Sequence, residues 1–279
     1  MPITLADLQR KKANSIKVCM VTAYDYTMAK LCSEAGADML LVGDSLGMVM
    51  LGYKDTVSVT MQDMIHHSRA VARGAEKPFV LTDMPFMSVR TGLRDAMINA
   101  GRLMAEGRAN GVKIEGGREL APMVTEMVRA GIPVMGHLGL TPQSVNALGG
   151  YRVQARALDA AQRLIEDAVA LDEAGAFGIV LECLPDRLAA LVSKNVHGIT
   201  IGIGAGSACD GQVLVLQDLL GMYSDIRPKF VRQFAEAGSC IRDGVASYCA
   251  AVRDGTFPDA AHSFAMDDAV YEALETKWG

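Results

Sequence analysis

The sequence predicts a closed (β/α)8 barrel, a single domain over residues 1–279 with an N-terminal extension and a C-terminal helical tail. Short, mostly unbroken apolar runs recur along the chain, as in strands that are buried on both faces. Amphipathic segments with helical spacing separate these runs. Such alternation implies parallel strands joined by right-handed crossovers, and eight runs favour a closed barrel over an open doubly wound sheet.

The eight expected strands are the apolar runs Val18–Thr22, Met39–Val42, Phe79–Leu81, Val112–Ile114, Pro133–Met135, Gly178–Leu181, Ile199–Ile203 and Val213–Leu216. The eighth run is the least distinct of them. The segment Gln212–Leu220, which contains it, also fits helical spacing. This ambiguity keeps the open sheet as the alternative.

Helices are expected between the strands. The side chains of Leu93, Met97, Ala100 and Met104 step by four, three and four residues, as one helical face requires. The same spacing occurs in Leu120–Met127, in Ala161–Leu171 and, near the C-terminus, in Ile241–Val252. A glycine that can take a left-handed conformation follows several of these segments and ends the helix, namely Gly36, Gly107, Gly131 and Gly175.

Composition narrows the class of function. The 27 basic and 32 acidic residues give a net charge of −5, which argues against a nucleic-acid or anionic-membrane partner. The most apolar stretch, Met39–Leu51, is interrupted by Asp44 and is too short to span a bilayer. The first residues lack the apolar region of a secretory signal. Six cysteines without a CxxC pair predict reduced thiols rather than disulfides or a zinc site.

Polar side chains stand where the predicted strands end. These residues are Asp44, Asp83, Lys113, Glu115, His137 and Glu182. In a parallel barrel all of these strand ends open onto one face, where barrel enzymes hold their active sites. Any one of these residues could instead cap the following helix. The whole set is harder to explain in that way, because carboxylates gathered at one barrel mouth repel each other unless a cation neutralises them.

The donor chemistry of this set points to a hard cation such as Mg²⁺, because its carboxylates supply oxygen and no Cys or His cluster accompanies them. Asp44, Asp83 and Glu115 are the candidate ligands, directly or through water. Lys113 lies on the same strand face as Glu115 and could pair with the carboxylates or with an anionic substrate. Glu182 is left free to act as a base.

Three further features have simpler interpretations. The segment Gly202–Gly211, GIGAGSACDG, indicates a tight backbone approach at a strand end, with contact to an anion or substrate as the alternative. His66 and His67 lie in a helical pattern without ligand spacing and are expected to be structural or solvated. Cys183 has no evident base nearby and is expected to be a small buried side chain.

Long motifs run through nearly the whole chain in one order. They are MVTAYDYTMAKL (Met20–Leu31), LVGDSLGMV (Leu41–Val49), DMPFMS (Asp83–Ser88), VKIEGG (Val112–Gly117), GHLGLTPQSVNALGGYRVQ (Gly136–Gln154), LECLP (Leu181–Pro185), IGIGAG (Ile201–Gly206), DGQVLVLQDLLG (Asp210–Gly221), PKFVRQF (Pro228–Phe234) and FPDAAHSF (Phe257–Phe264). In these motifs the sequence resembles the ketopantoate hydroxymethyltransferase (3-methyl-2-oxobutanoate hydroxymethyltransferase) family.

The resemblance implies a cytoplasmic, Mg²⁺-dependent barrel enzyme that is usually a decamer. It would transfer a one-carbon unit from 5,10-methylenetetrahydrofolate to 3-methyl-2-oxobutanoate, giving 2-dehydropantoate for pantothenate synthesis. By motif, the metal-site acids match Asp44, Asp83 and Glu115, and the proton acceptor matches Glu182. The substrate contacts match Asp44, Ser45, Asp83 and Lys113, with His137 as a further active-site residue that binds substrate.

The chain departs from the family pattern in three loops that we expect near the barrel mouth. Ser58 stands where the family has proline in Tyr53–Thr60, Arg152 and Ala155 alter the GGYKVQG motif, and Asp225–Phe230 reads DIRPKF. These changes would affect folate binding and loop closure more than the chemistry.

Two alternatives stay open at this stage. One is a metal-dependent C–C lyase or mutase of the phosphoenolpyruvate mutase and isocitrate lyase kind, although the KKCGH-type loop of those enzymes is absent. The other is a catalytically inactive barrel kept for assembly, against which the full set of acids with Lys113 argues.

Overall fold

The computed structural model describes residues 1–223 and 228–279. They form two compact units, one of Met1–Leu219 with Tyr223–Arg232 and one of Leu220–Met222 with Gln233–Gly279. Of the DIRPKF loop, Asp225–Arg227 lies outside the described residues. No helix in the described ranges is long and apolar enough to cross a membrane.

Eight parallel strands close into a barrel in sequence order, which confirms the predicted fold class. The strands are β1 (Val18–Thr22), β2 (Met39–Val42), β3 (Phe79–Asp83), β4 (Gly111–Glu115), β5 (Val134–Gly139), β6 (Gly178–Glu182), β7 (Ile199–Ile203) and β8 (Gly211–Leu214). Their side chains are mostly buried, as the unbroken apolar runs predicted.

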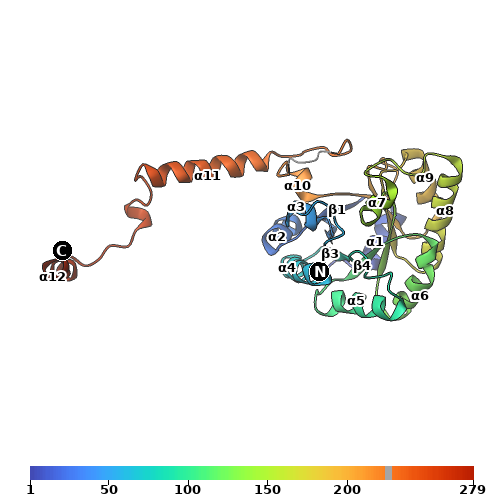
Figure 1. The fold of residues 1–279 in the computed structure, drawn as a ribbon, viewed down its shortest axis with the longest axis horizontal. Helices are drawn as coiled ribbons and strands as arrows, with labels where there is room; N and C mark the ends of the chain where they lie inside the picture. The colour runs from blue at the N-terminus through green and yellow to red at the C-terminus, as the bar shows by residue number, and fades with distance from the viewer. Residues whose placement is uncertain (224–227) are drawn as a thin grey trace. The chain divides into compact units, whose positions relative to one another are not determined.

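The helices of the first unit are α1 (Leu5–Ala13), α2 (Tyr26–Glu34), α3 (Leu46–Val49), α4 (Met61–Gly74), α5 (Leu93–Ala105), α6 (Ala121–Arg129), α7 (Val145–Leu148), α8 (Leu158–Glu173), α9 (Asp186–Asn195) and α10 (Leu216–Leu219), with single 3₁₀ turns η1 (Arg118–Leu120) and η2 (Pro142–Ser144). The longer helices α2, α4, α5, α6, α8 and α9 surround the strands (Figure 1). The helices expected from the spacing of apolar residues at α5, α6 and α8 are confirmed.

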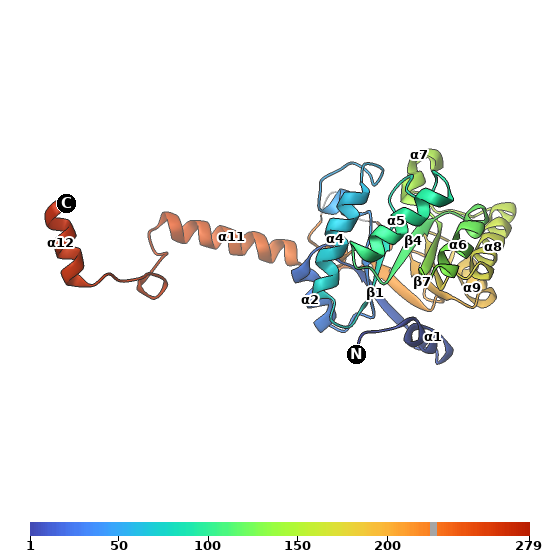
Figure 2. The same ribbon diagram turned by 90° about the horizontal axis from the view of Figure 1, so that it is seen from below.

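The N-terminal helix α1 covers one end of the barrel. A capping box between Thr4 and Asp7 starts the helix, and Leu8, which is 1% exposed, packs into the apolar core of the strands. Lys12 Nζ donates to the backbone oxygens of Val196, at 3.0 Å, and Gly198, at 2.6 Å. Figure 2 shows α1 and α7 at opposite ends of the barrel, so the strand ends that carry the polar residues open on the side away from α1.

The eighth strand differs in position from its prediction. It spans Gly211–Leu214, two residues earlier than expected, and the helix α10 begins at Leu216. The segment therefore contains both a strand and a helix, one directly after the other. The backbone N–H of Leu216 donates to Thr22 Oγ1 at 2.9 Å, which attaches the start of α10 to the end of β1.

The second unit contains α11 (Ala237–Arg253), the turn η3 (Ala260–His262) and α12 (Asp268–Trp278). The helix expected over Ile241–Val252 is thus present. Its apolar side chains are exposed by between 46% and 58%, and they are Ile241, Val245, Tyr248 and Val252. In the loop that follows α11, the ring of Phe257 packs edge-on against Tyr248.

Candidate active site

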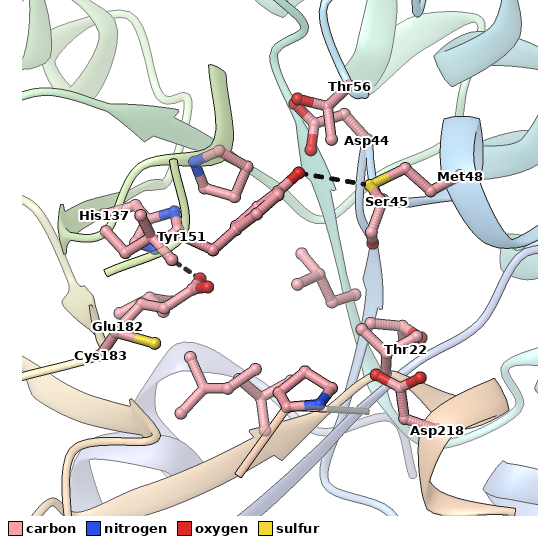
Figure 3. A pocket seen from close by; sticks show the side chains of 18 of the residues that line it. Thr22, Asp44, Ser45, Met48, Thr56, His137, Tyr151, Glu182, Cys183 and Asp218 are labelled. Carbon is pink, nitrogen blue, oxygen red and sulfur yellow. Dashed lines mark hydrogen bonds and ion pairs between the residues drawn. The ribbon is translucent and has the colours of Figure 1, made fainter. Parts of the chain in front are cut away.

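The barrel brings the predicted site residues together at one mouth. Asp83, Glu115 and Glu182 are the last residues of β3, β4 and β6, His137 lies in β5, and Asp44 follows β2. Together with Ser45 and Lys113 they line one cavity of about 470 Å³. Figure 3 shows Asp44, Ser45, His137 and Glu182 around this cavity. Closure of the barrel places these side chains in one cavity although they are far apart in sequence.

Lys113 is the cation at the centre of the acidic groups. It lies two residues before Glu115 on β4, so both side chains point into the barrel. Its Nζ is 3.0 Å from Asp83 Oδ1 and 3.9 Å from Glu115 Oε1, and all three side chains are buried. Burial lowers the pKa of Lys113, but the charges of Asp83, Glu115 and Asp44 outweigh that effect and raise it above the ordinary value.

Asp44 and Asp83 are the two carboxyl groups of the cluster whose pKa is raised. Burial is the main reason that the pKa of each carboxyl is raised, and repulsion from Asp83 and Glu115 raises that of Asp44 further. Asp83 Oδ2 accepts the backbone N–H of Asp44 at 3.1 Å. Asp83 Oδ1 is buried and lies 3.0 Å from the Lys113 ammonium, which is its charge partner. A carboxylate oxygen has two lone pairs, so this contact with Lys113 does not use up the capacity of Asp83 to accept.

His137 lies between Lys113 and two carboxylates. Its Nδ1 is 3.1 Å from Lys113 Nζ, with which it is hydrogen-bonded, and 3.3 Å from Glu115 Oε1, while its Nε2 lies 3.2 Å from Glu182 Oε2. Burial and the Lys113 ammonium lower the pKa of His137, but these two carboxylates outweigh them and raise it. The pKa of Glu115 is lowered because His137 and Lys113 overcome the effect of its burial. His137 therefore links the centre of the cluster to Glu182.

The neighbouring backbone fixes the place of Glu182. Gly139 at the end of β5 has φ +98°, and a Cβ there would meet the backbone oxygen of Glu182 at 2.2 Å. Glycine alone allows this approach, and Leu140 N–H then donates to the same oxygen at 2.9 Å. The end of β6 is held against β5, and the Glu182 side chain, 14% exposed, faces the cavity.

Ser45 is held by a residue that sequence reasoning did not single out. Tyr24 Oη and Ser45 Oγ are 2.8 Å apart, and Tyr24 is 1% exposed. Burial is the main cause that raises the pKa of Tyr24, so the phenol keeps its proton and can donate to Ser45. The Ser45 hydroxyl can then donate its own hydrogen into the cavity.

Gln143 in η2 is the second residue that the sequence analysis missed. Its backbone N–H donates to Glu115 Oε2 at 3.0 Å, and its Nε2 donates to Asp44 Oδ2 at 2.8 Å and to the backbone oxygen of Met84 at 2.9 Å. It supplies neutral donors to two crowded carboxylates. The quoted motif GHLGLTPQS contains Gln143, but an uncharged residue gives no signal of acceptors that lie far away in sequence.

Two of the three simpler interpretations agree with the structure. In the GIGAGSACDG loop, Gly206 has φ +81°, and a Cβ there would meet the Cβ of Asp186 at 2.5 Å, as a tight approach requires. His67 Nδ1 lies 2.6 Å from the backbone oxygen of Tyr24, which is a structural contact. The expectation that Cys183 is a buried side chain was wrong, because Cys183 is only partly buried and lines the cavity. Burial together with Glu182 raises its pKa to about 11, so its thiol is a poor nucleophile at neutral pH.

Comparison with known proteins decides the family. A family model described as ketopantoate hydroxymethyltransferase matches residues 2–260. The chain belongs to the ketopantoate hydroxymethyltransferase family. Relatives named 3-methyl-2-oxobutanoate hydroxymethyltransferase include one from Clostridium novyi, 54% identical over 98% of this chain and 100% of its own length. Another, from Enterococcus faecalis, is 53% identical over the same shares of the two chains.

Solved structures confirm the fold of this ketopantoate hydroxymethyltransferase family member. A phosphonopyruvate hydrolase in complex with oxalate and Mg²⁺ has a TM-score of 0.61 and 13% identity, over 99% of each chain. A 2,3-dimethylmalate lyase of the phosphoenolpyruvate mutase and isocitrate lyase superfamily has a TM-score of 0.58 and 15% identity, over 99% of this chain and 100% of its own. At such low identity the likeness shows a shared barrel fold alone.

Proposed function

We propose that this protein transfers a hydroxymethyl group from 5,10-methylenetetrahydrofolate to 3-methyl-2-oxobutanoate, in the cytoplasm, for pantothenate synthesis. The products are 2-dehydropantoate and tetrahydrofolate, and one water supplies the hydroxyl group. The observation that carries the proposal is the cluster of Asp44, Asp83 and Glu115 around Lys113 in one cavity, with Glu182 at its edge. Family membership supports the choice of 3-methyl-2-oxobutanoate as the oxo acid and of the folate as the one-carbon donor.

The donor set fits Mg²⁺. Asp44, Asp83 and Glu115 offer carboxylate oxygens, and Lys113 neutralises one of the three charges. Within residues 1–223 and 228–279, no three acidic, His or Cys side chains are placed to enclose an ion by themselves. Mg²⁺ commonly takes one or two protein carboxylates and completes its shell with water and substrate oxygens.

We assign the ion to Asp44 and Asp83. Glu115 would contact it directly or through water, since one Glu115 oxygen accepts the Gln143 N–H and the other faces Lys113 and His137. When bound, Mg²⁺ would polarise the ketone of the oxo acid and stabilise the negative charge that develops on its oxygen.

The chain itself binds and orients the oxo acid. Ser45, held by Tyr24, donates a hydrogen bond to the substrate carboxylate. Lys113 offsets the charge of that carboxylate at close range, in a buried setting where the attraction is strong. Asp44 and Asp83 would hold the ion on the same side of the cavity as these groups. These contacts orient the oxo acid so that C3 faces the β6 side of the cavity.

Glu182 acts as the base in this proposal. It removes the proton from C3, and the resulting enolate carbon forms a bond to the methylene carbon of the folate. Both bonds from that carbon to the folate nitrogens are broken in the overall reaction: the bond to C3 replaces one, and a bond to the oxygen of water replaces the other. The proton from C3 and one proton of the water end on the two nitrogens of tetrahydrofolate. The His137 ring holds the Glu182 carboxylate through Nε2, which lies 3.2 Å from Glu182 Oε2. The other ring nitrogen, Nδ1, lies close to Glu115. The His137 ring also forms part of the wall against which the substrate binds.

One experiment tests the base without the folate. The protein is incubated with 3-methyl-2-oxobutanoate and Mg²⁺ in D₂O, and loss of the C3 proton is followed by NMR. Wild type should exchange this proton, and Glu182→Gln should bind the oxo acid yet exchange at least about 100-fold more slowly. Fast exchange in the variant would remove Glu182 as the base. A full assay with the folate separates transfer from the lyase or mutase reaction and from an inactive barrel.

We further propose that the chain assembles with copies of itself, as a decamer by its family resemblance. The partly exposed apolar side chains of α11, including Val245 and Tyr248, are the kind of surface that marks an interface. Small molecules are the other partners that the cavity fits. The acidic charge balance gives no support for a nucleic-acid or membrane partner.

A further inference from the structure

One carboxylate in the cavity lies outside the acidic cluster. Asp218, on the short helix α10, lines the cavity and is half-buried. Figure 3 shows it beside Thr22 and apart from Asp44 and Thr56. Burial raises the pKa of Asp218, and no neighbouring charge contributes to the change. By contrast, Asp44 is strongly influenced by the other members of the cluster.

The structure gives Asp218 no partner. In the part of the chain that the structure describes, no hydrogen-bond donor and no ion-pair cation meets its carboxylate. A half-buried carboxylate without a protein donor takes its hydrogen bonds from water or from a ligand, and its place in the cavity wall makes it a candidate ligand contact. The mechanism proposed above does not use it.

The backbone that presents Asp218 is held in place by contacts of the two residues before it. Leu216 N–H donates to Thr22 Oγ1 at 2.9 Å, and Leu216 itself is buried. The next residue, Gln217, is 5% exposed, with its Nε2 3.4 Å from the sulfur of Met50. Asp218 follows directly and lines the cavity. Its position is therefore built by the fold rather than left to a free loop.

The surroundings define what the ligand must offer. Apolar side chains contribute much of the wall, among them Met48, Val49, Val153, Val215 and Phe230. A ligand for this region must be largely apolar and flat or narrow, and it must carry N–H or O–H donors at one edge. The oxo acid has only acceptor oxygens and a negative charge, so it cannot satisfy a second carboxylate.

The folate co-substrate carries hydrogen-bond donors of this kind. The pyrimidine ring of tetrahydrofolate carries an N3–H and a 2-amino group side by side, and both point along the same edge. Two parallel N–H donors match the two oxygens of one carboxylate, in the geometry that makes such pairs strong and directional. The broad faces of the ring system suit an apolar wall.

We propose that Asp218 binds the N3–H and 2-amino edge of the folate ring and so positions the one-carbon donor in the cavity. This inference rests on the proposed hydroxymethyl transfer. It assigns Asp218 to binding of the co-substrate, and it leaves proton removal from the oxo acid to Glu182 at the other side of the cavity.

The first test separates the two substrates kinetically. Asp218→Asn keeps the size of the side chain but replaces one acceptor oxygen with an N–H group, which repels the donor edge. We expect the KM for 5,10-methylenetetrahydrofolate to rise about 10- to 100-fold. The KM for 3-methyl-2-oxobutanoate and the rate of C3 proton exchange should stay within about twofold of wild type. Asp159→Asn removes the same charge from the exposed first turn of α8 and serves as the matched control.

The second test measures how much the 2-amino group contributes to binding, and it does not need turnover. Binding of tetrahydrofolate and of its 2-desamino analogue is measured by calorimetry. Wild type should bind tetrahydrofolate at least about tenfold more tightly than the analogue, and Asp218→Asn should lose this preference. An unchanged preference in the variant, or an unchanged KM for the folate, overturns the role of Asp218. Absence of both exchange and transfer in wild type would instead overturn the proposed function, and calorimetry would still decide on Asp218.

Discussion

Replacement of Gln143 by leucine tests how far neutral donors organise the acidic cluster. The change removes the Nε2 donor 2.8 Å from Asp44 Oδ2 and 2.9 Å from the backbone oxygen of Met84. It leaves the backbone N–H that donates to Glu115 in place. The variant therefore perturbs one carboxylate of the cluster while the loop keeps its second attachment.

The magnitude follows from the two hydrogen bonds. A hydrogen bond to a charged acceptor contributes about 1.5–3 kcal/mol, and one to a neutral carbonyl contributes about 1 kcal/mol. Water from the adjacent cavity can replace part of this, so the free energy of unfolding should fall by about 2 kcal/mol. Loss of a group that orients a metal ligand typically weakens metal binding by about 10- to 100-fold. We expect the Mg²⁺ concentration for half-maximal activity to rise by that factor.

The assay is C3 proton exchange of the oxo acid at increasing Mg²⁺, with urea denaturation in parallel. The matched control is Gln162→Leu, which removes a glutamine donor 2.9 Å from Glu166 on the exposed face of α8 and should change neither quantity. A folded Gln143→Leu protein with the Mg²⁺ dependence of wild type would show that Gln143 does not orient Asp44.

Three further predictions concern the metal, acid stability and assembly. Asp83→Ala should weaken Mg²⁺ binding, measured by calorimetry, at least about tenfold, and this loss should exceed the loss of fold stability measured by urea denaturation; unchanged Mg²⁺ dependence would defeat the assignment of this ligand. Burial raises the pKa of Asp172, but hydrogen bonds from the N–H groups of His197, at 2.9 Å, and Gly198, at 2.7 Å, outweigh it and lower the pKa overall. The stabilisation by Asp172 should therefore be complete above about pH 4 and disappear as the pH falls through the lowered pKa. Asp172→Ala should lower the free energy of unfolding by about 1–3 kcal/mol at pH 7 and by less at pH 3, and an equal difference at both values would refute this. Val245→Glu on α11 should reduce the oligomer size seen by light scattering, and an unaltered mass would exclude this face from the interface.

The barrel and most of its site could be predicted from sequence because their signals are local. Unbroken apolar runs identify strands that are buried on both faces, and apolar residues spaced by three and four positions identify α5, α6 and α8. The polar residues at the ends of β3, β4 and β6 could then be assigned to one mouth by the rule for parallel barrels. At β8 the predicted bounds were displaced by two residues, because strand and helix signals overlapped in one short segment.

The order of the elements and the chemical groups at each strand end can be taken from the amino-acid sequence. Which of those groups meet depends on the folded barrel: the approach of Lys113 to Asp83, the support of Ser45 by Tyr24, the two carboxylates held by Gln143, and the isolation of Asp218. Periodicity reflects burial of single residues, whereas these contacts join positions far apart in the chain and arise only when the eight strands close into a ring.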